Sequence, residues 1–296
     1  MRRITVTAVA VTLAAGAALS SLSACSSISS SAASSAGTST ASANTASCGY
    51  ASVQNELYQK GTLTVATDQP AYTPWFVNNQ PSNGQGYESA VAYAVAGQLG
   101  FKASQVKWAY EPFDDSYAPG PKKFDFDINE ISYSPQRATA VTFSNSYYAD
   151  QQALVALKDS PIVAKHSPSE LKTYSYGDQI GTTSLSFIND EIAPTQTPKV
   201  YDTLNDVKQA LQDKQIAGFV TDTPTAQYIA ADEIPGTVVV AQFPATGEHF
   251  GLLFAKGDPL VGCVNKALGT LWSNGTIAKL ANKWLNIYTS IPTIAP

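Results

Sequence analysis

The chain has 296 residues, of which 18 are Lys or Arg and 23 are Asp or Glu, so its formal net charge is −5. A mildly acidic protein lacks the basic surface that nucleic acid or an anionic membrane attracts. Two histidines and three cysteines are too few for a multi-ligand metal site, so we expect neither a metal nor a cofactor. Hydrophobic residues make up 44% of the chain, enough for a sizeable core, and the length favours two domains.

Residues 1–24 are typical of an export signal. Arg2 and Arg3 precede an uncharged, Ala-rich stretch over residues 4–19, which is shorter than the roughly 20 residues that span a bilayer. Residues 22–25, Leu-Ser-Ala-Cys, resemble the lipobox of bacterial lipoproteins, in which the Cys thiol carries a lipid. The resemblance implies that Cys25 anchors the mature protein to the outer face of the cell membrane. An ordinary signal peptide with a chance cysteine is the alternative.

A Ser/Ala/Thr-rich segment follows over residues 25–48. Such a composition cannot bury enough apolar area to offset its ordering entropy, so we expect a disordered, lipid-anchored linker. Its root-mean-square reach would be roughly 25 Å.

Two cysteines remain once Cys25 is set aside, namely Cys48 and Cys263. An even pair in an exported chain predicts a disulfide, which would tie the start of the folded body to a C-terminal helix. Two buried free thiols are the alternative.

Strand and helix patterns alternate along the folded body, which predicts an α/β fold with mainly parallel sheets. The expected strands cover residues 63–67, 106–110, 124–131, 152–157, 176–180, 216–220, 238–240 and 251–255. The expected helices cover residues 87–99, 203–211 and 258–284, the last with a break at 274–275.

Three expected strand-to-helix turns carry candidate ligand-binding residues. Arg137 follows the expected cap Ser134, and a cation in a first helical turn opposes the helix dipole unless an anion offsets it; pairing with a surface carboxylate is the alternative. Asp222 lies at the carboxyl end of a strand, where open α/β sheets bind ligands, or else caps the next helix. Residues 181–184, Gly-Thr-Thr-Ser, offer amides and hydroxyls, or form an ordinary capped turn. A cation, an anion and neutral donors together fit a zwitterion such as a free amino acid.

Several motifs in fixed order carry a family resemblance. They are GTLTVATD (61–68), YTPWF (72–76), GYE (86–88), ISYSPQR (131–137), FS (143–144), YY (147–148), QIGTTS (179–184) and GFVTDTPTA (218–226). On these residues the chain resembles the polar amino-acid substrate-binding proteins of ABC importers, solute-binding protein family 3. The matches run from about residue 61 to residue 284, nearly the whole folded body.

The resemblance implies an α/β, two-lobe periplasmic-binding-protein-like (type II) fold with a hinge of two crossover strands. Lobe 1 would comprise residues 49–148 and 251–296, and lobe 2 residues 149–250. The crossovers are expected near residues 148–154 and 250–253. The ligand would lie between the lobes, which close over it by a hinge motion.

The resemblance also implies roles for individual residues. Arg137 would hold the ligand's α-carboxylate with help from Thr182 and Thr183, because an Arg fork suits a carboxylate. Asp222 would take the α-ammonium with help from Ser132 and the backbone of Glu130. The remaining ligand-binding candidates are Tyr72, Trp75 and Phe113 as walls of the side-chain pocket, together with Asp68.

Glu130 departs from the family pattern, which commonly has a small or neutral residue at this position. A Glu130 that faces the cleft would favour a cationic ligand side chain, or its own pKa would rise beside Asp222. A Glu130 that faces away would instead pair with a Lys.

We therefore expect a monomeric extracytoplasmic lipoprotein that captures a polar amino acid, with a cationic one as an option. It would deliver this amino acid to the transmembrane subunits of an ABC permease, and it would not be an enzyme. Two alternatives remain: a dehydratase-like enzyme of the same fold, for which Glu130 is the candidate acid or base, and an importer-independent amino-acid sensor.

Overall fold

The computed structural model describes residues 48–285, 291 and 293–294, all of which belong to one compact unit. The expected signal peptide, the lipidation site at Cys25 and the linker up to residue 47 lie outside the described residues. Among the described residues, no helix combines the length and the apolar character needed to span a bilayer.

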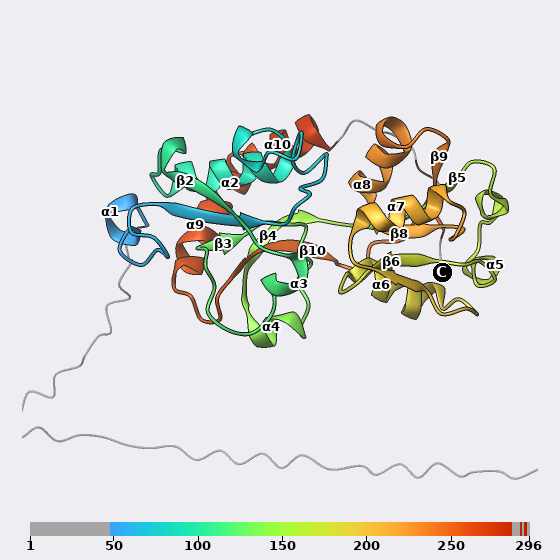
Figure 1. Cartoon of the computed structure of the whole chain (residues 1–296). Helices are drawn as coiled ribbons and strands as arrows, with labels where there is room; N and C mark the ends of the chain where they lie inside the picture. The colour runs from blue at the N-terminus through green and yellow to red at the C-terminus, as the bar shows by residue number, and fades with distance from the viewer. Residues whose placement is uncertain (1–47, 286–290, 292, 295–296) are drawn as a thin grey trace, which may run out of the picture. The chain divides into compact units, whose positions relative to one another are not determined.

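The described body has two lobes, each built around its own sheets (Figure 1). The first lobe contains a five-stranded sheet in the order β2-β1-β3-β10-β4, and the second contains a three-stranded sheet, β8-β5-β9, and a two-stranded sheet, β6-β7. The strands are β1 (Leu63–Thr67), β2 (Val106–Tyr110), β3 (Phe126–Asp127), β4 (Thr142–Ala149), β5 (Gln152–Leu157), β6 (Gly177–Gln179), β7 (Lys199–Tyr201), β8 (Phe219–Asp222), β9 (Thr237–Gln242) and β10 (His249–Phe254).

Helices cover these sheets and bury their apolar faces. The longer ones in the first lobe, α2, α9 and α10, pack against one another, and α7 joins the second lobe's core through Leu204, Val207 and Leu211. The helices are α1 (Tyr50–Val53), α2 (Tyr87–Gln98), α3 (Phe113–Ser116), α4 (Arg137–Ala140), α5 (Pro168–Leu171), α6 (Thr183–Phe187), α7 (Leu204–Gln212), α8 (Thr223–Tyr228), α9 (Leu260–Ser273) and α10 (Thr276–Trp284). Single 3-10 turns cover Pro81–Asn83, Ala103–Gln105 and Pro161–Ala164, and π-helical turns cover Ile188–Ile192 and Ile229–Glu233.

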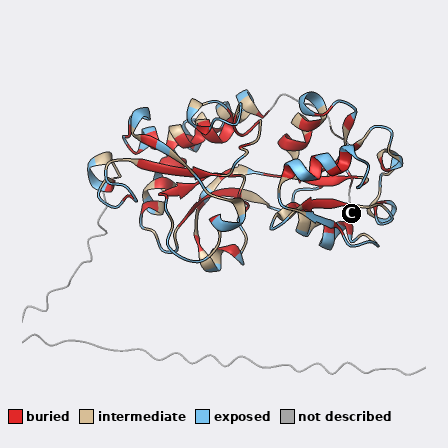
Figure 2. Cartoon of the chain, in the orientation of Figure 1, coloured by how far each residue is buried: buried red, intermediate tan, exposed pale blue. Residues whose placement is uncertain are grey.

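The central strands are buried, as Figure 2 shows. Every residue of β1 is buried, and so are the first five residues of β5. A strand that is covered on both faces needs mostly apolar, β-branched or small side chains, and this composition predicted β1 and, apart from Gln152, β5 from the sequence. The break expected at residues 274–275 is also present, because α9 and α10 meet at Gly275 with a φ of 75°.

The sheets are mixed rather than mainly parallel, so that expectation was wrong. Pairing is parallel for β1 with β2, β1 with β3 and β6 with β7. It is antiparallel for β10 with β3 and β4, and for β5 with β8 and β9. The antiparallel strands adjoin the two chain crossings, where the chain leaves one sheet and enters the other. β4 was not predicted, because its sequence TFSNSYYA has too many polar residues to resemble a buried strand.

The first crossing lies between Ala149 and Gln152, within the expected segment. The second lies between Gln242 and His249, earlier than expected, because residues 250–253 are part of β10. The assignment of residues 251–296 to lobe 1 also needs correction at its end. Ile294 packs in a second-lobe cluster, and its amide donates to the carbonyl of Gln242 at 3.0 Å.

Cys48 and Cys263 form a disulfide with an S–S distance of 2.13 Å. It joins the segment just before α1 to the first turns of α9. The predicted bridge is confirmed, and it closes a loop with a sequence separation of 215.

Candidate ligand-binding site

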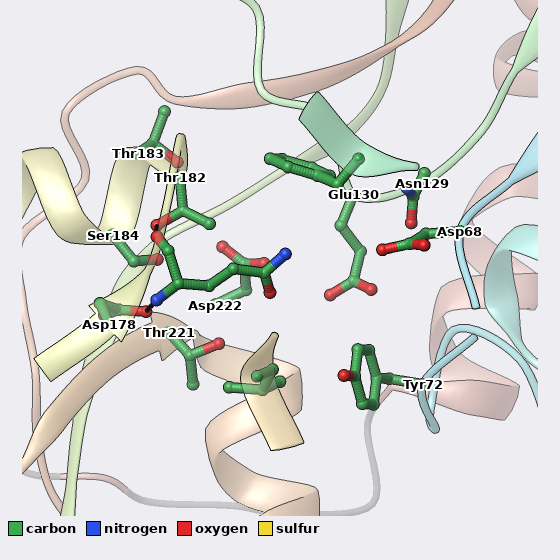
Figure 3. Close-up of a pocket in the computed structure, with 13 residues that line it drawn as sticks. Asp68, Tyr72, Asn129, Glu130, Asp178, Thr182, Thr183, Ser184, Thr221 and Asp222 are labelled. Atoms are coloured by element: carbon green, nitrogen blue, oxygen red, sulfur yellow. Dashed lines mark hydrogen bonds between the residues drawn. The ribbon is translucent and has the colours of Figure 1, made fainter. Parts of the chain in front are cut away.

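A pocket between the two lobes gathers residues from both (Figure 3). Its described lining includes four carboxyl groups and no Lys, Arg or His. The residues that line it are Asp68, Tyr72, Phe113, Asn129 and Glu130 from the first lobe, and Asp178, Gln179, Thr182, Thr183, Ser184, Leu204, Thr221 and Asp222 from the second.

Asp222 ends β8 at the floor of this pocket. It occupies the N-cap position of α8, but its side chain makes no capping hydrogen bond. Its Oδ1 instead accepts a hydrogen bond from Nε2 of Gln152 at 3.1 Å. Burial, more than any other cause, raises the pKa of Asp222 to about 7. The side chain of Asp222 therefore does not cap α8, and it lines the pocket instead.

Glu130 points into the pocket, toward Asp222 (Figure 3). Its backbone has a left-handed φ of 52°, which ends the extended segment after β3. Its Oε2 accepts a hydrogen bond from Oγ1 of Thr225 at 3.2 Å. Burial, followed by the charges of Glu88 and Asp222, raises its pKa well above the usual range. Glu130 therefore faces the cleft and does not pair with a Lys.

The unusual backbone of Glu130 is held from behind by Glu88, which is fully buried in the first turn of α2. Oε1 of Glu88 accepts hydrogen bonds from the backbone amide of Glu130 at 2.7 Å and from the hydroxyl of Tyr147. Burial raises the pKa of Glu88 to about 8. Because a left-handed backbone is unfavourable for a residue with a side chain, this contact supports the direction in which Glu130 points.

Arg137 begins the short helix α4, and 9% of its surface is exposed. Its guanidinium donates to the carbonyls of Ser132 at 2.7 Å and Gly181 at 2.8 Å, rather than to a surface carboxylate. It also lies over the rings of Phe113 and Tyr117, with its Cζ 5.5 and 4.5 Å from their centroids. The group sits beside the pocket wall that Phe113 forms, and it spans from one lobe to the other.

A hydrogen-bonded network joins the Arg137 end of the site to Asp222. The hydroxyl of Ser132, whose carbonyl accepts from Arg137, donates to Oε1 of Glu248 at 2.6 Å. Nε2 of Gln152 lies 3.0 Å from Oε2 of Glu248 and 3.1 Å from Oδ1 of Asp222. Glu248 lies in the second chain crossing and Gln152 directly after the first, so the network connects the ligand-binding candidates through the hinge.

Residues 181–184 include a helix cap and two hydroxyl groups that contact other residues of the binding region. Thr182 caps α6, because its hydroxyl accepts from the amide of Leu185 at 3.0 Å. The hydroxyl of Thr183 lies 3.3 Å from that of Ser132, and Ser184 donates to Oε1 of Gln152 at 2.7 Å. The capped turn expected from the sequence is therefore present, and the role of these residues as donors to a ligand stays a prediction.

Of the expected aromatic walls, Tyr72 and Phe113 line the pocket and Trp75 does not. Trp75 is fully buried and packs edge-on against Tyr148 and Phe250 in the first-lobe core. Its indole donates to Thr225 at 2.7 Å, so it lies one layer behind Glu130. Its apolar bulk is better buried in the core than exposed in a polar cleft, which the sequence motif alone did not indicate.

Several polar residues of this region were missed from the sequence: the pocket-lining Asn129, Asp178 and Thr221, and Glu88, Asp150, Gln152 and Glu248 around them. Gln152 carried a signal, because it is the one polar residue in the apolar segment QALVAL. Glu88 stood in a quoted motif without a role. Asp150 and Glu248 carried no local signal, because each acts through contacts to distant parts of the chain. Asp68 lines the pocket as expected, and burial raises its pKa to about 6.

Comparison with known proteins identifies the family. Residues 63–287 match the model of the bacterial extracellular solute-binding proteins, family 3, and the chain belongs to this family. The arginine-binding extracellular protein ArtP of Bacillus subtilis (strain 168) is 25% identical over 241 residues, which cover 80% of this chain and 91% of that protein. The lysine/arginine/ornithine-binding periplasmic protein of Escherichia coli (strain K12) is 27% identical over 244 residues, covering 77% and 89%.

Solved structures agree in fold. An ancestral arginine-binding protein bound to arginine aligns with a TM-score of 0.64 and 27% identity, covering 76% of this chain and 98% of that one. The ancestral amino acid-binding protein AncCDT-1, a precursor of cyclohexadienyl dehydratase, aligns with a TM-score of 0.65 and 28% identity, covering 80% and 98%. The predicted family and its two-lobe fold are confirmed.

Proposed function

We propose that this protein captures a free amino acid with a cationic side chain between its two lobes and delivers it to the transmembrane subunits of an ABC importer. Three features support the proposal: the family, the relatives named for arginine, lysine and ornithine, and an interlobe pocket rich in carboxyl groups. In this proposal Arg137, Thr182 and Thr183 hold the α-carboxylate end, and Asp222 with Ser132 holds the α-ammonium.

The observation that carries the cationic preference is the direction of Glu130. Its carboxyl group shares the pocket with those of Asp222 and Asp68, and the described lining offers no basic side chain to compensate them. Buried or half-buried carboxylates are unfavourable unless they are paired. A ligand with two positive groups and one negative group would supply the missing charge, whereas an acidic ligand would increase the repulsion.

A thermal-shift panel over the twenty amino acids, with ornithine added, tests this proposal. We expect the melting temperature to rise most with arginine, lysine, ornithine or histidine, and not with aspartate or glutamate. Glu130→Gln should reduce the preference for the cationic ligands over the neutral ones. A panel in which no amino acid shifts the melting temperature, or in which acidic ones shift it most, would overturn the proposal.

The proposal includes binding without chemical conversion. The relatives above are named as binding proteins, although one structural neighbour is described as a precursor of a dehydratase. Glu130 is the group that such an enzyme would use as acid or base. Mass spectrometry of the ligand after long incubation with the protein should recover it unchanged, and a product that forms only with Glu130 intact would favour the enzyme alternative.

The proposal also places the protein outside the cytoplasm as a monomer tethered by a lipid on Cys25, in keeping with relatives named extracellular or periplasmic. Cys25→Ser should release the protein from the membrane fraction, and Ala24→Ser should leave it there. Uptake of the labelled amino acid by cells should fall when the gene is deleted, whereas an importer-independent sensor would leave uptake unchanged.

A further inference from the structure

We propose that Glu130 and Asp222 form one two-carboxyl site, which holds a proton in the ligand-free protein and exchanges it for the ammonium group of the bound solute. The inference rests on the proposed function and adds a chemical step to it. The bonds involved are simple: a carboxyl O–H bond breaks, the proton leaves to solvent, and N–H···O hydrogen bonds from the ammonium take its place.

The first observation is that Glu130 and Asp222 line one pocket, whose described lining contains no basic side chain. Two carboxyl groups that share a site repel each other when both are ionised, and the charge of Asp222 raises the pKa of Glu130 accordingly. One of the two therefore keeps a proton more readily than an isolated carboxyl group would. The neutral donors to the pair, Gln152 at 3.1 Å and Thr225 at 3.2 Å, satisfy only one oxygen each.

A second, independent observation comes from buried oxygens behind the pocket. Within the described part of the chain, Oδ1 of Asp150 and Oε2 of Glu88 are buried and have no hydrogen-bond partner, and both residues are at most 2% exposed. An unpartnered ionised oxygen would be very unfavourable in such a place. Burial raises the pKa of both of these flanking groups, and neither of them lines the pocket. The Glu130–Asp222 pair does line it, so its proton is the one that a ligand would displace.

The groups around the pair add negative charge or none. Glu130 faces Glu88 of α2 and, through it, Tyr147 of β4, while the charges of Glu88 and Asp222 raise its pKa. Asp222 faces Asp150, Gln152 and Glu248, and its own pKa of about 7 places the exchange near neutral pH.

Basic side chains near the pocket wall are engaged elsewhere. Lys208 lies over the ring of Tyr72 at 4.8 Å and pairs with Glu233 at 2.6 Å. Arg137 donates to two backbone carbonyls. Neither provides the positive charge that two ionised carboxylates in one pocket require, so a proton supplies it until the ammonium of the ligand arrives.

Isothermal titration calorimetry tests the exchange by counting protons. The wild-type protein is titrated near pH 6.5 with whichever of arginine, lysine, ornithine or histidine gives the largest thermal shift, in buffers of small and large ionisation enthalpy. We expect the observed enthalpy to depend on the buffer with a slope that corresponds to the release of about one proton. Since each released proton makes affinity depend on pH, Kd should fall up to about tenfold per pH unit between about pH 6 and 7.

Glu130→Gln keeps a side chain of the same length that can donate to Asp222, so its titration should show little proton release and a nearly flat pH dependence. Asp159→Asn is the matched control, because it removes one carboxylate from an exposed pair with Lys214 and should keep the wild-type slope. Wild-type binding with no buffer dependence and a flat Kd over this range overturns the exchange and leaves the proposed function standing. Failure of all four amino acids to bind overturns both.

Discussion

The bridging position of Arg137 leads to a sharp prediction for Arg137→Ala. The guanidinium donates to the carbonyls of Ser132 and Gly181, and it stacks on Tyr117. Under the proposed function it also receives the ligand's carboxylate. The substitution therefore removes an interaction of the ligand-free protein and an interaction of the complex, and these two losses can be measured separately.

The loss in the ligand-free protein depends on which carbonyl is left without a donor. Gly181 is exposed, so water can replace the guanidinium there, whereas Ser132 is only 2% exposed. A lost hydrogen bond to a charged donor costs about 1.5–3 kcal/mol, and the lost contact with Tyr117 adds about 0.5–1 kcal/mol. We expect the free energy of unfolding without ligand to fall by about 2–4 kcal/mol.

The loss in the complex is measured as the stabilisation that the ligand gives to wild-type protein and no longer gives to Arg137→Ala. At a ligand concentration 100 times Kd, wild-type protein should gain about 2.7 kcal/mol. For a protein of this size each kcal/mol moves the melting temperature by about 2–4 °C, so the shift should be about 5–11 °C. At the same ligand concentration, Arg137→Ala should show no shift. Differential scanning calorimetry with and without ligand gives both quantities.

Lys214→Ala serves as the control, because it also removes one positive charge but from an exposed pair with Asp159 at 2.7 Å. Exposed pairs contribute about 0–1 kcal/mol, so both its stability and its ligand shift should stay close to wild type. A ligand shift in Arg137→Ala as large as in wild type would refute the carboxylate-binding role, whatever the variant's own stability.

Three further predictions concern the fold. Reduction of the Cys48–Cys263 disulfide, whose sequence separation is 215, frees a long loop in the unfolded chain. The free energy of unfolding should therefore fall by up to about 5 kcal/mol. Equal urea midpoints with and without reductant would contradict this expectation. Gly86→Ala places a Cβ 2.3 Å from the carbonyl oxygen of Trp75 at a φ of 95°, whereas a Cβ at Gly236, with a φ of 89°, meets nothing within 4 Å. In chemical denaturation, Gly86→Ala should lower the free energy of unfolding by at least about 3 kcal/mol and Gly236→Ala by about 1–2 kcal/mol. Burial raises the pKa of Asp127 from 3.8 to about 7, so the folded state binds this proton more tightly than the unfolded state. The Asp127 contribution to the free energy of unfolding should therefore fall as pH rises from about 4 to 7, by up to about 1.4 kcal/mol per pH unit. Asp127→Asn should make the measured profile less steep by this amount, and an unchanged slope would contradict the assignment.

Much of the fold could be predicted from local patterns. The strands β1, β2 and β5 lie where the runs of apolar and β-branched residues placed them. The helix expected over residues 203–211 is present as α7, and Thr203 caps it by accepting from the amide of Asp206. These features depend on residues a few positions apart, so the sequence displays them directly. β4 was missed because it is half-exposed and polar, and its pairing with β10 joins segments about one hundred residues apart.

By itself the sequence determined the family, the alternation of strands and helices, and the pairing of the two cysteines of the folded body. It also led to the prediction that Arg137 and Asp222 hold the two ends of a ligand, which remains a proposal. Only the tertiary structure decided that Glu130 faces the pocket, that Trp75 lies behind it, and that Gln152 and Glu248 connect the two ends through the hinge. The physical reason is that a side chain's direction and charge state depend on neighbours from distant segments, such as Glu88 holding the backbone of Glu130, and no local pattern encodes those neighbours.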